Sequence, residues 1–248
     1  MLLKRLYEAA APRLTGRRVR EVCIGAELLA VVLDDGHMGV AYSLPGERTE
    51  ALPDVKALMG VSALELAAGL LTEGLLERAI GLAACSAVAE PDSAHWLKDV
   101  DAAEAVAARP ADTVGLVGFI RPVAARLTGH VARLIIFDRS EREGVYPEEE
   151  QPVLLPQCDL VFITGSSLTN GTLERLLGWC TRAREVAVLG PTTPLYPEIF
   201  AGTPVTVLAG ATWPEETQQA ALEAISQGAC YRDISSLSHR WVLRVGTK

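Results

Sequence analysis

The chain has 248 residues, 49% of them hydrophobic, a formal net charge of −8 and a pI near 5.1. This length allows one large domain or two small ones, and the apolar fraction is enough for a packed core. The acidic balance argues against a nucleic-acid partner, which favours a basic surface, and against electrostatic attraction to an anionic membrane.

The longest apolar runs, LLAVVL and DLVFI, have the length of strands. They fall well below the ~20 residues that a membrane-spanning helix needs. The N-terminal stretch MLLKRLYEAAAPRL has the spacing of an amphipathic helix, without the continuous apolar segment or cleavage site of a signal peptide. We therefore expect a cytoplasmic protein.

Cysteines and histidines form no recognisable metal-binding pattern. The five cysteines include no CxxC pair, and the four histidines are scattered without an HxxxH pair. An odd cysteine count at these spacings disfavours a disulfide framework and a zinc ribbon or finger. No metal ligands are predicted among the protein's own side chains.

The first 90 residues have the pattern of an α+β unit. After the N-terminal helix, residues 19–24, 28–33 and 37–44 read as three strands joined by short turns, which makes them antiparallel neighbours. Helical patterns then begin at Ser62, with a possible capping box, and at Leu75. The prediction is a small domain in which helices back a three-stranded meander.

From residue 112 onward, apolar strands alternate with helices. Strands that are apolar throughout indicate a parallel sheet covered on both faces. We predict a Rossmann-like α/β domain with the spatial strand order 3-2-1-4-5 and right-handed crossovers. The boundary is placed near Pro110, giving an α+β domain at 1–108 and a Rossmann-like domain at 109–248. The predicted strands are TVGLVGF, ARLIIFDR, DLVFITG, REVAVLG and TPVTVLAG.

In such a sheet, ligands bind beyond the carboxyl ends of the strands. The first strand lacks the G-x-G-x-x-G fingerprint, and the Walker pattern is also missing, so NAD, FAD and ATP in their usual modes are disfavoured and the cofactor is unknown. Arg121 could meet a carboxylate or phosphate, or be a solvated first-turn residue. Asp138 could bind a ribose, or form a surface ion pair with its neighbour Arg139.

The stretch TGSSLTNGTLERLL follows the third strand and opens an amphipathic helix. Gly165 allows a sharp turn or a close approach to a ligand, and Thr169 or Asn170 could cap the helix. Free amides at the helix start and nearby hydroxyls could instead bind an anion. The two readings, a capped loop and a ligand site, stay open.

VGFIRPV, IIFDRS, TGSSLTNGTLERLL, VLGPTTPLYPEIF and VTVLAGATW, in this order, resemble the heavy-metal-chelation family of prokaryotic proteins. CIGAELLAVVLDDGHMGVAYSL and LLERAIGLAACSAV resemble its companion domain, which has an enolase N-terminal-like fold. The resemblance implies a ligand cleft between the two domains. One departure is that the family's helix usually has Asn where this chain has Cys85 or Ser86. The implied ligand-binding residues are Gly118, Arg121, Asp138, Thr164, Gly165, Ser166, Asn170, Gly171, Thr172, Gly190, Pro191 and Thr192.

The leading hypothesis is a protein that binds a small anionic or metal-bearing metabolite in the interdomain cleft, in heavy-metal chelation or handling. An alternative is an enzyme, a transferase or lyase of small-molecule or cofactor biosynthesis, for which Asp138 and Cys85 are the catalytic candidates. A further alternative is a metal-handling accessory protein without catalysis. A homodimer is expected on general grounds only.

Overall fold

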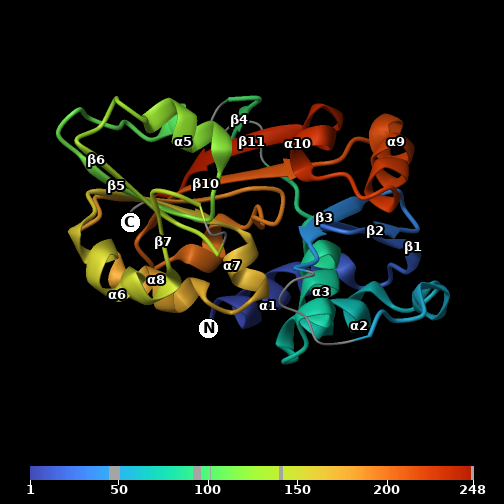
Figure 1. Ribbon diagram of the computed structural model, residues 1–248. Helices are drawn as coiled ribbons and strands as arrows, with labels where there is room; N and C mark the ends of the chain where they lie inside the picture. Colours follow the sequence, from blue (N-terminus) through green and yellow to red (C-terminus); the bar gives the residue numbers. More distant parts are fainter. Residues whose placement is uncertain (45–50, 92–95, 101, 140–141, 247–248) are drawn as a thin grey trace.

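In the residues that it describes, the computed structural model has two β-sheets, and the smaller one lies to the right of the larger one in Figure 1. A three-stranded sheet belongs to the N-terminal part, and an eight-stranded sheet to the C-terminal part. The fold is the predicted α/β arrangement, in which a small α+β unit precedes a mostly parallel sheet. The structure describes residues 1–44, 51–91, 96–100, 102–139 and 142–246.

The N-terminal unit is the predicted antiparallel meander with helices against it. Ser62 lies at the N-cap of α2 as expected, but its side chain makes no capping hydrogen bond, so the predicted capping box is not formed. The elements are α1 (Leu2–Leu14), β1 (Val19–Ile24), β2 (Leu28–Leu33), β3 (Met38–Tyr42), α2 (Ala63–Ala67) and α3 (Leu75–Ala87).

Strand β2 is buried along its whole length, which explains why LLAVVL is continuously apolar. Leu29 and Val31 pack on the face that holds α1 and α3. Leu28 and Ala30 pack on the opposite face, against the C-terminal helix α9 (Glu215–Ser226). A strand covered on both faces has no need of a polar side. The C-terminal part of the chain therefore completes the core of the N-terminal unit.

The larger sheet has the order β4-β11-β10-β9-β8-β5-β6-β7. The strands from β10 to β7 run parallel, while β11 and β4 are antiparallel additions at the other edge. The strands are β4 (Leu97–Lys98), β5 (Thr113–Val117), β6 (Arg133–Phe137), β7 (Val145–Tyr146), β8 (Leu160–Thr164), β9 (Glu185–Leu189), β10 (Val205–Thr212) and β11 (His239–Arg244).

The predicted strand order 3-2-1-4-5 is wrong. The five predicted strands are β5, β6, β8, β9 and β10, and their observed order is 2-1-3-4-5, because β8 pairs with β5 rather than with β6. Burial accounts for this choice. All but the last residue of β8 are buried, whereas β6 begins with the exposed Arg133 and has half-buried positions. The more apolar strand takes the central place, and the switch point moves to β5 and β8.

Helices cover both faces of the parallel sheet, as predicted. On one face α5 packs Val123 and Leu127 over Val114 and Leu116 of β5. The opposite face is covered by α6 and α8. The helices of the C-terminal part are α4 (Ala102–Ala105), α5 (Arg121–Leu127), α6 (Gln151–Leu154), α7 (Ser166–Thr169), α8 (Leu173–Trp179), α9 (Glu215–Ser226) and α10 (Tyr231–Ile234).

An ion pair clamps the amino ends of β5 and β9. Both Arg184 Nη atoms lie 2.7 Å from the oxygens of Asp112, a side chain that is 4% exposed. These hydrogen bonds hold the pKa of the Asp112 carboxyl below its usual value, so the folded state binds the proton less tightly than the unfolded state. The resulting stabilisation is complete above the unfolded pKa of about 3.9 and is lost as the pH falls through the folded pKa.

We expect Asp112→Asn to lower the free energy of unfolding by about 2 kcal/mol at pH 7, because a buried charge-assisted pair is broken. The difference from the wild type should shrink as the pH falls below about 4. Urea denaturation at several pH values measures both effects. The control is Glu104→Gln, which removes the exposed ion pair with Arg126 (2.9 Å). If the free energy of unfolding of Asp112→Asn changes with pH as that of the wild type does, the Asp112–Arg184 pair is not the source of this pH dependence.

Candidate functional site

A pocket of about 210 Å³ lies at the carboxyl ends of β5, β6 and β8, beside the switch point of the sheet. Loops that are far apart in the sequence meet there because parallel strands end at a common edge. Six of the twelve predicted binding residues line this pocket: Gly118, Asp138, Thr164, Ser166, Asn170 and Thr172.

Gly118 turns the chain from β5 toward α5. Its φ of +90° lies in the left-handed region, and a Cβ at this position would stand 3.0 Å from Thr164 Cγ2. The neighbouring Phe119 N–H donates to Asp138 Oδ2 at 2.8 Å, which ties the end of β5 to the end of β6. Glycine is therefore required by the backbone and by the close approach of the Thr164 side chain.

The end of β8 presents a cluster of hydroxyl groups to the pocket. Thr164 Oγ1 and Ser166 Oγ lie 3.1 Å apart, and both side chains line the pocket. Ser167 Oγ donates to the Thr164 carbonyl at 2.7 Å, which fixes the turn into the four-residue helix α7. Such hydroxyls can either donate or accept hydrogen bonds from a ligand.

The expected N-cap at Thr169 or Asn170 is wrong. The chain forms α7 first, and the N-cap of α8 is Thr172, whose side chain makes no capping hydrogen bond. Asn170 lies two residues before it and accepts from Thr172 N–H at 3.3 Å and from Thr172 Oγ1 at 2.8 Å. The polar stretch therefore closes a local turn at the pocket wall instead of capping the helix at the expected residue.

The other predicted residues lie outside the pocket lining. Gly165 packs against the loop that follows β9, where a Cβ would stand 2.6 Å from Thr193 N. In that loop Thr192 is fully buried and its Oγ1 accepts from Tyr42 N–H of β3 at 2.9 Å, so it joins the two parts of the chain. The lining set omits Arg121, which is exposed, together with Gly165, Gly171, Gly190, Pro191 and Thr192.

The two catalytic candidates differ sharply. Asp138 lines the pocket and holds the Phe119 N–H, as described above. Cys85 is fully buried in α3, outside the lining, and burial raises the pKa of its thiol. Its neutral thiol would be a poor nucleophile in this position. Ser86, the other residue at the departure from the family pattern, is 8% exposed.

Sequence reasoning missed lining residues that come from outside the strand ends. Leu44 follows β3 in the N-terminal unit, and Gln151 opens α6. Glu148, part of an acidic run that reads as a solvated loop, also lines the pocket and pairs with Arg139 at 2.6 Å between Oε1 and Nε. No local motif marks these residues, because only the tertiary fold brings them to the rim.

Within the described part of the chain, no cluster of three or more His, Cys, Asp or Glu side chains has the geometry to hold a metal ion. The same residues contain no helix with the length and apolarity needed to cross a membrane.

Together, the fold and the pocket define a two-part α/β protein with a cavity of about 210 Å³ at the rim of a Rossmann-like sheet. Residues 101–244 match the domain family DUF364, and residues 7–89 match DUF4213; both carry the description "Putative heavy-metal chelation". The chain belongs to this heavy-metal-chelation family, as its motifs predict.

Two solved structures share this fold. A DUF364-family protein of unknown function from Pyrococcus horikoshii has a crystal structure with a TM-score of 0.86 and 25% identity, over 99% of this chain and 100% of that one. The crystal structure of a second such protein, from Desulfitobacterium hafniense, has a TM-score of 0.79 and 24% identity over 98% of both chains. An uncharacterized protein of Methanocaldococcus jannaschii is 33% identical over 140 residues, which span 54% of this chain and about half (54%) of that protein.

Proposed function

We propose that the pocket at the ends of β5, β6 and β8 binds a small anionic or metal-bearing metabolite. The observation that carries the proposal is that residues from three strand ends, including Gly118, Asp138 and Thr164, line one cavity of about 210 Å³. The family description supports a link to metal handling. The division into domains at residues 108 and 109, and a cytoplasmic location, stay predictions.

The chemistry of the lining favours a metal complex over a bare ion. The pocket presents hydroxyl groups of Thr164, Ser166 and Thr172 and the amide of Asn170. Its two carboxylates, Asp138 and Glu148, already hold the Phe119 N–H and Arg139. Hydroxyl and amide groups hydrogen-bond to carboxylates or phosphates, whereas soft heavy metals prefer thiolate and imidazole ligands. In this proposal the bound metabolite supplies most of the metal's ligands, and the protein recognises the metabolite.

Truncation of Asn170 tests this binding site. We expect Asn170→Ala to weaken the binding of a zinc–citrate complex about tenfold, because a wall hydrogen-bonding group is lost. Isothermal titration calorimetry with zinc–citrate, zinc alone and citrate alone measures the effect. Ser226→Ala, which removes an exposed hydroxyl on α9, is the control and should bind as the wild type does. If Asn170→Ala and Ser226→Ala bind zinc–citrate with equal affinity, the binding site lies outside this pocket.

Asp138 keeps the enzymatic alternative open, since a carboxylate at the pocket wall could transfer a proton. The experiment is the substitution Asp138→Asn. If the pocket is catalytic, this change should abolish turnover of a substrate and leave its binding measurable. If the pocket only binds, it should change affinity alone.

A further inference from the structure

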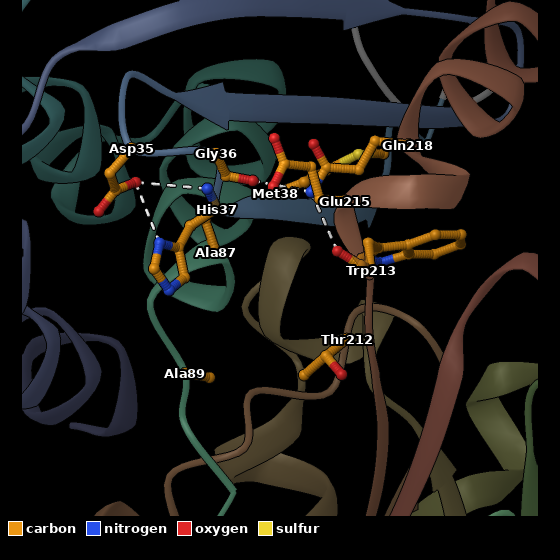
Figure 2. Close-up of a pocket in the computed structure, with 10 residues that line it drawn as sticks. All are labelled: Asp35, Gly36, His37, Met38, Ala87, Ala89, Thr212, Trp213, Glu215 and Gln218. Atoms are coloured by element: carbon orange, nitrogen blue, oxygen red, sulfur yellow. Dashed lines mark hydrogen bonds and ion pairs between the residues drawn. The ribbon is translucent and has the colours of Figure 1, made fainter.

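A second cavity, of about 260 Å³, lies where the two parts of the chain meet (Figure 2). Its walls are the turn between β2 and β3, the end of α3, the end of β10 and the start of α9. The two cavities share none of their described lining residues. The second cavity is therefore a separate site, and its chemistry can be read independently of the proposed function.

Glu215 supplies a negative charge at this cavity. It is the first residue of α9 and is exposed, and its carboxyl carbon lies 3.8 Å from the point where a Cβ on Gly36 would stand. It makes no ion pair with any other described residue. An ionised carboxylate only accepts hydrogen bonds, so a ligand group that contacts Glu215 should be a hydrogen-bond donor or a cation.

Gln218 supplies a neutral acceptor in a fixed orientation. Its side chain is 4% exposed, and Nε2 donates to the carbonyl oxygens of Gly36 at 2.7 Å and Trp213 at 3.0 Å. Two carbonyl partners determine which end of the amide carries the hydrogens. The remaining atom, Oε1, accepts no hydrogen bond from a described residue. A buried unpaired acceptor is unfavourable, and an N–H group of a ligand would satisfy it.

His37 lines the cavity and contacts Asp35. Its Nδ1 lies 3.0 Å from Asp35 Oδ1, and its main-chain N–H donates to the same oxygen at 3.3 Å. Burial alone would raise the pKa of Asp35, but hydrogen bonds from Arg17 and His37 outweigh it and lower the pKa to about 2. The other ring nitrogen, Nε2, points away from Asp35 (Figure 2).

We propose that this cavity binds a small organic cation that carries N–H donors, such as a primary ammonium group. Glu215 and Gln218 bring acceptor oxygens to its lining, and none of the described lining residues is Lys or Arg. The net charge of −8 adds a favourable long-range field. The volume of about 260 Å³ is smaller than the roughly 300–1,000 Å³ of most ligand sites, so the occupant is a short diamine or the amine end of a longer molecule.

Calorimetric titration with 1,4-diaminobutane tests the proposal, with 1,4-butanediol as a neutral compound of the same length. The wild type should bind the diamine saturably and leave the diol unbound. Glu215→Gln should weaken diamine binding about tenfold or more, because a charge-assisted hydrogen bond is lost. Glu216→Gln is the matched control: Glu216 is exposed in the same first turn but does not line the cavity, and its variant should bind as the wild type does.

The assignment would be overturned by no saturable diamine binding, by equal binding of the diol, or by an equal loss in Glu215→Gln and Glu216→Gln. The last result would show that the diamine senses only the overall negative charge. Asn170→Ala should leave diamine binding unchanged, so failure of this site and failure of the strand-end pocket can be told apart. A wild-type diamine affinity in Glu215→Gln would equally contradict the proposal.

Discussion

Gly39→Ala should destabilise the protein by about 4 kcal/mol or more, an exceptionally large effect for one methyl group. Gly39 lies in β3 directly beneath α3, where a Cβ would stand 2.0 Å from the Ala83 carbonyl oxygen and 2.5 Å from Ala87 N. Both neighbours are main-chain atoms of a helix, so no side chain can move aside. Helix α3 would have to lift off the sheet and lose its packing.

Chemical denaturation of Gly39→Ala measures this loss, and far-ultraviolet circular dichroism reports a variant that fails to fold. The control is Gly178→Ala in α8, where no atom lies within 4 Å of the added Cβ. Alanine is the better helix former, so this variant should gain about 0.5–1 kcal/mol. If the free energy of unfolding of Gly39→Ala lies within about 1 kcal/mol of the wild-type value, α3 does not pack this closely on β3.

Arg78→Met should lower the free energy of unfolding by about 3 kcal/mol and also weaken ligand binding in the strand-end pocket. Arg78 is 8% exposed in α3, and its Nη1 donates to the Thr169 carbonyl at 3.0 Å. Its Nε and Nη2 donate to the Thr72 carbonyl at 3.2 and 2.8 Å. Loss of a charged donor leaves these partly buried carbonyls unpaired, and each such bond contributes about 1.5–3 kcal/mol.

The effect on binding follows from position. Thr169 directly precedes Asn170, which lines the pocket, so Arg78 acts as a positioning residue that holds this loop from the N-terminal unit. Denaturation and zinc–citrate titration of the same variant separate stability from affinity. Glu73→Gln removes only the fully exposed ion-pair partner of Arg78, at 3.7 Å, and should change neither quantity measurably. Unchanged zinc–citrate affinity in Arg78→Met would remove the positioning role.

The sequence predicts the fold class because each main strand carries its own signal. The apolar run DLVFI and the three short strands of the meander with their tight turns are visible without tertiary information. Three strands escape such reasoning. β4 and β7 have only two residues each, and β11 is defined by its antiparallel pairing with β10. The order of β6 and β8 likewise depends on which of the two strands buries more apolar surface in the centre of the sheet. The local sequence pattern of one strand does not show this.

The candidate site is predictable in part for the same reason. Gly118 and Thr164 follow strands, and strand ends of a parallel sheet share one rim. The loop at Gly190 shows the limit of this argument. It also follows a strand, but its Thr192 is buried against Tyr42 of the N-terminal unit and so lies outside the pocket lining. Residues such as Leu44 reach the pocket only through packing between distant parts of the chain.

The most direct test of the strand-end site is anomalous diffraction from crystals soaked with the zinc–citrate complex. The account predicts a zinc peak in the pocket between Thr164 and Asn170, with most of the metal's ligands supplied by the citrate and the hydroxyl groups of the wall bonded to its carboxylates. A peak outside this pocket, or zinc held chiefly by side chains of the protein, would contradict it.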